Sequence, residues 1–245
     1  MSLPDTQIQD LLAFTDELAD AARAAILPYF RADVAVEAKS GAGKPFDPVT
    51  QADKEAEASI RRLIEARYPA HGIIGEEFGA KSGNAPFTWV LDPIDGTRAF
   101  IAGLPLWGVL IGLTHEDAPL IGVIDQPYLG ERFRGWGSGA ELITAAGARP
   151  LKTKSCARLT EAVLATTDPK LFNGAEAGGF EHVRATAKLT RYGCDCYAYA
   201  MVALGHVDLV VESGLAPWDA AALEPIIAGA GGVVTDWRGD SLARS

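Results

Sequence analysis

Apolar residues recur at every third or fourth position through the first 30 residues, with charged residues between them. This period predicts an amphipathic helix that ends near Pro28. Its apolar positions are Leu11, Phe14, Leu18, Ala22 and Ile26. A polar segment rich in Gly and Pro follows at residues 40–48 and predicts a loop. A second helix is expected to begin after Thr50, where Thr50 and Asp53 have the spacing of a capping box, and to end before Pro69.

From residue 71 the pattern changes to short β-branched runs between turn residues, which predicts strands. These runs lie at residues 72–75, 88–91, 109–114, 120–125, 132–136 and 141–144. After a polar segment at residues 148–155, strands are expected to alternate with helices. The later strands are predicted at 162–166, 207–212 and 232–236, and the later helices at 180–189, 197–204 and 217–228. We therefore predict an α/β (α+β) fold in two domains, residues 1–148 and 149–245, with antiparallel strands in the first.

The composition is typical of a globular protein. The 245 residues are 48% hydrophobic and 22% charged, and no apolar run approaches the roughly 18 residues of a membrane span. The 32 acidic residues exceed the 22 basic ones, and the resulting net charge of −10 disfavours binding to nucleic acid. The three cysteines and the absence of basic residues near the N-terminus favour a cytoplasmic protein without a leader peptide or a disulfide scaffold.

A pair of carboxylates directly follows one of the predicted strands. Asp92 and Asp95 lie in the segment DPIDGT, residues 92–97, and two negative charges in one turn are unfavourable unless a cation binds them. Gly96 and Thr97 stand at the start of a further apolar stretch. Backbone N–H groups at such a turn or helix start are suited to binding an anion. Acids beside an anion site are what a Mg²⁺-phosphate site requires. The alternative is an Asx-turn with a helix cap, which uses the same residue types.

Further acids are expected at equivalent positions. Glu76 follows the strand predicted at 72–75, and Asp219 lies in the first turn of the last predicted helix. Asp47 and Asp53 flank the entry to the second helix. Each has a simpler explanation, because an acid at a helix start caps the helix or complements its dipole. Together with the pair in DPIDGT, they indicate two or more divalent ions that share oxygen ligands, an arrangement that hydrolyses phosphate esters.

The segments GEE at residues 75–77, DPIDGT at 92–97 and WDAA at 218–221 occur in an order and spacing that resembles the inositol monophosphatase family. The resemblance covers nearly the whole chain. It implies a layered α/β/α/β/α sandwich, usually a homodimer, and a Mg²⁺-dependent, lithium-sensitive phosphatase that acts on a small phosphate monoester. It also implies a last strand and helix after the equivalent of residues 237–240, in a chain that runs past the equivalent of Ser245, which puts the edge of the second sheet, the stability and the dimer contacts in question.

The same resemblance gives expected roles to individual residues. The metal ligands would be Glu76, Asp92, the carbonyl oxygen of Ile94, Asp95 and Asp219. Glu76 and Asp92 would hold a first Mg²⁺, Asp92 would bridge to a second, and Glu76 would help to place a weaker third; Mn²⁺ could replace Mg²⁺. The catalytic set would be Thr97, Asp47 and Glu76, with Thr97 and Asp47 orienting and deprotonating the attacking water. Backbone N–H groups of Gly96 and Thr97 would receive the phosphate.

Three segments are similar to the histidinol-phosphate phosphatase branch of that family. They are TRAFIAG at 97–103, YGCDCYAY at 192–199 and GHVDLVVE at 205–212. Asp195 and Glu212 would bind the amine and imidazole of L-histidinol, and the alternative for both is a solvated or capping carboxylate. Arg98 would either steady the phosphate or brace a carboxylate.

We therefore predict a Mg²⁺-dependent phosphomonoesterase that hydrolyses L-histidinol phosphate to L-histidinol and phosphate, a step of histidine biosynthesis. One alternative is an inositol-1-phosphate phosphatase, or a broader sugar or nucleotide phosphatase of the same family. An alternative of another class is a non-catalytic binding or regulatory protein. The complete acidic set argues against this last alternative, because a degenerate copy should have lost acids from it.

Overall fold

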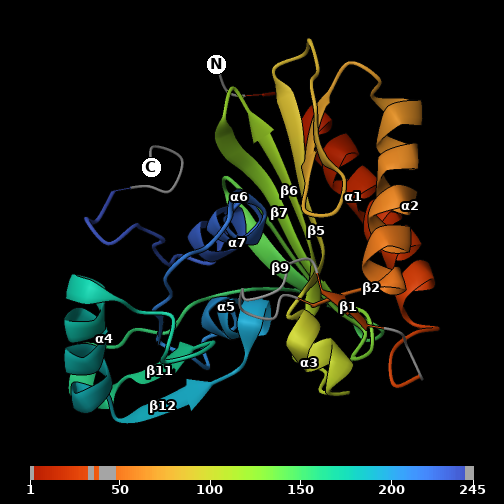
Figure 1. Ribbon diagram of the computed structural model, residues 1–245. Coiled ribbons are helices and arrows are strands. Elements are labelled where there is room, and N and C mark those ends of the chain that lie inside the picture. The colour runs from red at the N-terminus through yellow and green to blue at the C-terminus, as the bar shows by residue number, and fades with distance from the viewer. Residues whose placement is uncertain (1–2, 33–35, 39–47, 241–245) are drawn as a thin grey trace.

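The computed structural model describes residues 3–32, 36–38 and 48–240 of the chain. Its elements form five layers: a helix pair, an eight-stranded sheet, a middle helical layer, a three-stranded sheet and an outer helix (Figure 1). This is the predicted α/β/α/β/α arrangement. Within the described ranges, no helix combines the length and the apolar character needed to cross a membrane.

The first layer consists of α1 (Asp5–Ile26) and α2 (Gln51–Arg67), which lie side by side with bounds close to the predicted ones. Their apolar stripes are buried against each other and against the large sheet. The predicted capping box is present at the start of α2. Asp53 Oδ2 accepts hydrogen bonds from the Thr50 backbone N–H at 2.8 Å and from the Thr50 hydroxyl at 2.6 Å. For Asp53, the structure thus supports the capping explanation.

A short two-stranded sheet precedes α2. It pairs β1 (Val36–Ala38) with β2 (Pro48–Thr50) in antiparallel fashion, and neither strand was predicted. The loop expected at residues 40–48 lies outside the described residues, apart from Pro48 at the start of β2.

The large sheet has the strand order β10-β9-β8-β7-β6-β5-β3-β4. Its strands are β3 (Gly72–Gly75), β4 (Gly79–Lys81), β5 (Phe87–Asp95), β6 (Gly108–His115), β7 (Ala118–Gln126), β8 (Glu131–Trp136), β9 (Gly139–Thr144) and β10 (Gly147–Pro150). All neighbours pair antiparallel except β3 and β5, which are parallel. The six strands predicted for this half are present, β4 and β10 are additional, and β5 continues through the acidic motif that was expected to follow it.

The second face of this sheet is covered by α6 (Pro217–Ala220) and α7 (Leu223–Gly229), which come from the second half of the chain. Glycines on the strands allow this close approach. A Cβ atom at Gly122 would lie 2.0 Å from the Ala222 carbonyl oxygen, and one at Gly135 would lie 2.3 Å from the Ile226 Cα. Side chains at these two positions would force the helices away from the sheet.

The second half builds a three-stranded parallel sheet with the order β12-β11-β13. Its elements are the 3₁₀ turn η1 (Leu159–Glu161), β11 (Val163–Thr166), α4 (Gly174–Thr186), β12 (Leu189–Tyr192), α5 (Asp195–Ala203) and β13 (Leu209–Val210). α5 lies between the two sheets, while α4 covers the outer face of the small sheet. There Phe180 of α4, and Phe172 just before it, pack against Leu164 of β11. The large sheet ends at Pro150, and the division into two domains stays a prediction.

Three predictions for the second half were wrong in detail. Residues 232–236 do not form a strand; the Gly232 N–H donates to the Ile227 carbonyl of α7 at 2.8 Å, and the Asp236 N–H donates to the Asp240 carbonyl at 2.8 Å within a turn. The helix predicted at 217–228 is divided into α6 and α7, since Pro225 has no N–H to continue one helix through this point. The helix predicted at 180–189 is α4, which begins six residues earlier, at Gly174, and ends at Thr186. Leu189, its expected last residue, begins the short edge strand β12.

Candidate active site

The three acids Asp92, Asp95 and Asp219 meet where the end of β5 faces the start of α6, and one oxygen of each lies within 4.8 Å of the others. In a regular strand, residues three apart point to opposite faces of the sheet. The pairing of β5 with β6 changes register between Asp92 and Asp95, and this irregularity lets both carboxylates reach one cluster.

Each of these carboxylates is fixed by a backbone N–H group. Asp92 Oδ1 accepts from Ile94 at 3.0 Å, inside the motif itself. Asp95 Oδ2 accepts from the Cys196 backbone at 2.5 Å, and this bond joins the large sheet to α5. Asp219 Oδ2 accepts from Ala216 at 2.7 Å, a bond from the third residue of α6 back to the backbone at its N-cap. The cluster is therefore set in place by both halves of the chain.

The electrostatics of the cluster oppose its ionisation. Burial raises the pKa of Asp92 well above its usual range, and the charges of Glu76, Asp95 and Asp219 raise it further. The carboxyl groups of Glu76 and Asp92 also share a hydrogen bond. Burial raises the pKa of Asp95 to about 8, with Asp195 and Asp219 acting in the same direction. Hard oxygen donors that repel one another at this distance fit a divalent cation such as Mg²⁺, which would replace the retained protons.

The residues expected to bind phosphate lie directly beside this cluster. Gly96 has a φ of 87°, in the left-handed region, and a Cβ atom there would lie 3.1 Å from the Cβ of Asp195. Glycine is thus required both for the turn and for the close approach of α5. Thr97 begins α3 (Thr97–Ile101), and its hydroxyl donates a hydrogen bond of 3.1 Å to the Ile94 carbonyl. Asp47, the expected partner of Thr97, lies outside the described residues.

Asp195 and Glu212, the acids expected to bind substrate, flank the same cluster. Asp195 has a φ of 43°, which is unusual for a residue with a side chain and directs the next N–H group at Asp95. Burial raises the pKa of Asp195 to about 6, and the positive charge of the exposed Arg98 opposes this rise. Arg98 therefore lies close enough to act on Asp195, in line with the second of its two expected roles.

Glu212 follows β13 and accepts a hydrogen bond of 2.6 Å from the Thr167 backbone N–H. Burial raises its pKa to about 7, the Thr167 hydrogen bond opposes this, and the charges of Asp195 and Asp219 add to it. Two carboxylates, Asp195 and Glu212, thus lie within electrostatic reach of each other and of the cluster. A cationic group placed between them would be stabilised by both.

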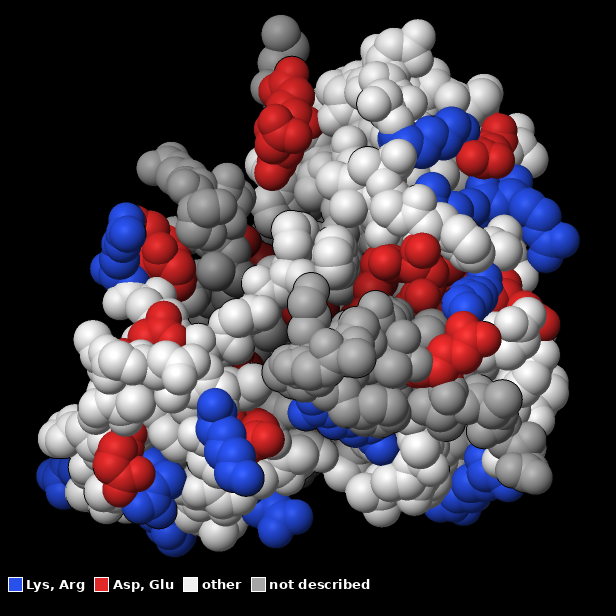
Figure 2. Space-filling view, viewed as in Figure 1, with Lys and Arg blue, Asp and Glu red and all other residues white. Residues whose placement is uncertain are grey.

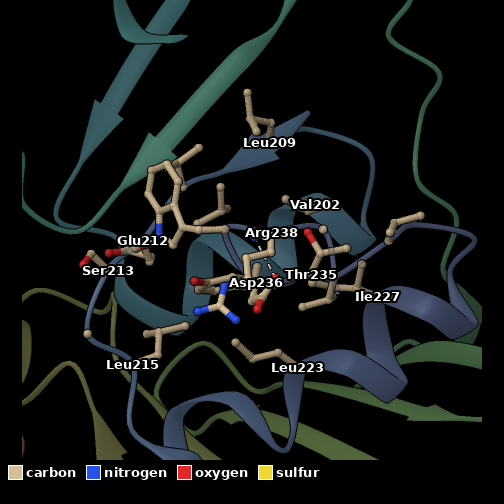
Figure 3. Close-up of a pocket in the computed structure, with 18 of the residues that line it drawn as sticks. Val202, Leu209, Glu212, Ser213, Leu215, Leu223, Ile227, Thr235, Asp236 and Arg238 are labelled. Atoms are coloured by element: carbon tan, nitrogen blue, oxygen red, sulfur yellow. Dashed lines mark hydrogen bonds between the residues drawn. The ribbon is translucent and has the colours of Figure 1, made fainter. Parts of the chain in front are cut away.

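A cavity of about 700 Å³ lies on the other side of Glu212, between β13 and residues 233–239 (Figure 3). Its walls are mainly apolar, and they include Leu209, Leu223 and Ile227. The three clustered acids are not part of its lining. We therefore place the candidate site at the carboxylates and not in this cavity, because the clustered acids suited to binding a divalent cation lie outside its lining.

The distribution of charged side chains on the surface agrees with a site built from acids. On the face shown in Figure 2, Lys and Arg side chains form separate groups among Asp and Glu side chains, and acidic side chains line a hollow near the middle. This is a surface suited to cations and to a metal-bound small anion. It contains no continuous basic patch on the part of the chain that is described and visible in this view.

Sequence reasoning missed two groups that support this site. The Cys196 backbone N–H binds Asp95, and Glu57 of α2 lies completely buried beneath the loop that carries Glu76. The Cys196 contact joins positions 101 residues apart and has no local signal. A signal for Glu57 existed, because this acid falls on the apolar face of α2 next to Ala56 and Ile60.

Comparisons with known proteins agree with this geometry. The family model described as the inositol monophosphatase family matches residues 7–244. The bifunctional phosphatase IMPL2, chloroplastic, of Arabidopsis thaliana is 44% identical over 239 residues, 97% of this chain and 67% of that protein. A histidinol-phosphatase of Chlorobaculum parvum is 38% identical over 226 residues, 91% of this chain and 84% of that protein. The solved structure of an inositol monophosphatase from Zymomonas mobilis is 40% identical, with a TM-score of 0.84 over 96% of this chain and 88% of that one.

Proposed function

This chain belongs to the inositol monophosphatase family of metal-dependent phosphatases, and we propose that it hydrolyses L-histidinol phosphate to L-histidinol and phosphate with Mg²⁺. The observation that supports this substrate is the pair of carboxylates Asp195 and Glu212, which lie beside the acidic cluster. Histidinol has an ammonium and an imidazole that titrates near neutral pH, whereas inositol has hydroxyl groups only. A carboxylate bonds a charged amine more strongly than a hydroxyl.

The acids of the site hold the metal in this proposal. Glu76, Asp92 and the Ile94 carbonyl would hold one ion, and Asp92, Asp95 and Asp219 would hold a second. Bound Mg²⁺ would supply Lewis acidity, lowering the pKa of a water and neutralising phosphoryl oxygens.

The remaining residues orient the reactants. Thr97, whose hydroxyl lies 3.1 Å from the Ile94 carbonyl, would orient the attacking water together with Asp47, and the Asp47 carboxylate would take up the proton that the water loses. The backbone N–H groups of Gly96 and Thr97, at the left-handed turn where α3 begins, would bind the phosphate oxygens. Arg98 braces Asp195, which with Glu212 binds the leaving alcohol through its amine.

The substrate assignment is tested with Glu212→Gln, which keeps the shape and removes the charge. Loss of one charge-assisted hydrogen bond is worth about 1.5–3 kcal/mol. We expect kcat/KM for L-histidinol phosphate to fall by about 10- to 150-fold, while p-nitrophenyl phosphate, which has no amine, is hydrolysed almost as before. Equal losses on the two esters would contradict the assignment. Wild-type turnover that favours inositol-1-phosphate over L-histidinol phosphate would support the inositol phosphatase instead, a name carried by the Zymomonas mobilis relative.

A homodimer is part of this proposal, and an exposed apolar patch supports it. The patch consists of Ile101, Leu104, Tyr128 and Leu129, each between 42% and 50% exposed. Arg31 ties its two segments together by donating hydrogen bonds to the Gly103 carbonyl at 3.0 Å and to the Tyr128 hydroxyl at 2.6 Å. Analytical ultracentrifugation should find a dimer for the wild type and for Leu189→Glu, whose site is equally exposed elsewhere, and a monomer for Leu104→Glu.

A further inference from the structure

The loop between β3 and β4, residues 76–78, carries Glu76 into the acidic cluster. Beneath this loop lies Glu57 of α2, whose side chain is completely buried. Glu57 Oε2 accepts a hydrogen bond from the Glu77 backbone N–H at 2.7 Å, and Oε1 accepts one from the Phe78 backbone N–H at 3.2 Å. One buried carboxylate thus binds the two residues that directly follow Glu76.

Arg61, one turn further along α2, completes this arrangement. Its Nε donates to Glu57 Oε1 at 2.7 Å, and its terminal nitrogen donates to the carbonyl of Gly79, where the loop ends. Both oxygens of Glu57 are therefore used, and its charge is matched by a guanidinium that binds the same loop. A buried carboxylate with this full set of donors is rigidly held.

Gly75, the residue before Glu76, has a packing requirement of its own. A Cβ atom at this position would lie 2.0 Å from Glu57 Oε1 and 2.4 Å from Glu57 Cδ. The glycine at 75 therefore makes room for the Glu57 carboxylate. Glu57 therefore contacts the chain on both sides of Glu76. It packs against residue 75, and it accepts hydrogen bonds from residues 77 and 78.

We infer that Glu57 is a positioning residue for divalent-cation binding, which acts by fixing the loop that presents Glu76 to the cluster. The inference rests on the proposed metal-dependent function. It assigns Glu57 no contact with metal or substrate: its oxygens face backbone donors and Arg61. Its effect on the ion passes through the position of the Glu76 carboxylate alone.

Glu57→Gln is the sharpest perturbation, because it is nearly isosteric. An amide has one acceptor oxygen, so its NH₂ group must face either the Glu77 N–H or the pair formed by Arg61 and the Phe78 N–H. Either orientation sets donor against donor and releases one side of the loop. Partners of this kind, one step removed from a metal, typically change metal affinity by about 10- to 100-fold when they are mutated.

The experiment measures Mn²⁺ binding by electron paramagnetic resonance of the free ion, without substrate. The matched control is Glu55→Gln, the same change on the same helix, where the carboxylate accepts from Tyr29 and Gln51 instead. We expect Mn²⁺ affinity to fall by about 10- to 100-fold in Glu57→Gln and to stay at the wild-type value in Glu55→Gln. Circular dichroism of each variant at the assay temperature establishes that it is folded.

A double-mutant cycle with Glu76→Gln separates positioning from general damage. If Glu57 acts through Glu76, then adding Glu57→Gln to Glu76→Gln should weaken Mn²⁺ binding no further. Gly75→Ala provides a second route, because its new methyl group displaces the Glu57 carboxylate without changing any charge; it should weaken binding in the same manner. This variant also serves if Glu57→Gln does not fold.

Two results would overturn the inference: unchanged Mn²⁺ affinity in both Glu57→Gln and Gly75→Ala, or additive losses in the cycle. Failure of the proposed function looks different, because the wild type itself would then bind no Mn²⁺ in the range where the variants are compared.

Discussion

Raising the pH of the protein in EDTA from about 5 to about 8 should lower its free energy of unfolding, because the fold keeps Asp95 protonated. Burial raises the pKa of Asp95 to about 8, and the charges of Asp195 and Asp219 add to the rise. In an unfolded chain an Asp carboxyl has a pKa of about 3.9. The stabilisation linked to this proton is therefore complete below pH about 4 and is lost as the pH rises through about 8.

The size of the loss follows from the pKa. Between pH 5 and pH 8 the unfolded chain has already released the Asp95 proton, while the folded protein releases it only near the upper limit. Nearly three pH units at about 1.36 kcal/mol each give a loss of about 4 kcal/mol. Asp95 retains some access to solvent, which reduces this value, so we expect about 2–4 kcal/mol.

Urea unfolding in EDTA at both pH values measures this loss. Asp95→Asn removes the titration and keeps an oxygen that can accept from the Cys196 N–H, so it should be more stable than the wild type at pH 8 and similar to it at pH 5. Asp117→Asn, the same change at an exposed hairpin tip, is the control and should follow the wild type. Wild type and Asp95→Asn with the same pH dependence would refute the reasoning.

Saturating Mg²⁺ should narrow the difference in stability between the two proteins at pH 8. A ligand at 100 times its dissociation constant stabilises the folded state by about 2.7 kcal/mol. The ionised wild type should gain this stabilisation, and Asp95→Asn should gain much less. At pH 5 the gain should be smaller for both proteins, because Mg²⁺ must first displace protons from the cluster.

Three further predictions concern single residues. Asp92→Asn should lower turnover by at least about 100-fold at saturating Mg²⁺ in a phosphate-release assay, because it removes the shared charge; near-wild-type turnover would exclude the bridging role. Thr97→Ala should lower kcat far more than KM in steady-state kinetics, and an effect on KM alone would make Thr97 a binding residue. Asp125→Ala should cost about 3 kcal/mol in urea unfolding, because it leaves the buried Arg132 without its main partner, whereas Glu181→Ala on the surface should cost under about 1 kcal/mol.

Local patterns were sufficient for most of the fold. The helical period gave α1 and α2 to within a few residues, and Thr50 with Asp53 located the start of α2, because a capping box depends on residues three apart. The short β-branched runs gave the central strands of the large sheet, which are buried on both faces. The layered architecture followed from the resemblance, and the structure agrees with it.

Other elements depend on contacts that a local pattern does not contain. The edge strand β12 is largely exposed, so it has no apolar alternation to reveal it. Residues 232–236 do have a strand-like composition, but in the folded chain the N–H groups at the two ends of the segment bond to α7 and to the turn at Asp240. The supporting contact from Cys196 to Asp95 crosses 101 residues, and Glu57 to Glu77 crosses 20. Such contacts follow from the packed fold and not from the order of residues.

The large sheet holds two kinds of buried acid, and their partners explain why only one kind belongs to the site. Asp125 of β7 is completely buried, and its Oδ1 is 2.9 Å from Arg23 and 2.8 Å from Arg132. Its countercharge comes from the chain itself, so this acid is part of the fold. For Asp92 and Asp95, the described residues provide no ion pair with Lys or Arg, and the nearest charges are further acids.

A fold that buries acids next to acids is less stable than one with neutral side chains at the same positions. Such an arrangement is expected where the missing positive charge comes with a ligand. The same reasoning extends to Asp195 and Glu212, which lie partly buried beside the cluster. Burial raises the pKa of both, and the charges of Asp195 and Asp219 add to the rise at Glu212. Mg²⁺ can neutralise the cluster, while an amine on the substrate can neutralise the flanking pair. In the proposed function, the two sets of acids therefore divide one site into a part that selects the phosphate and a part that selects the alcohol.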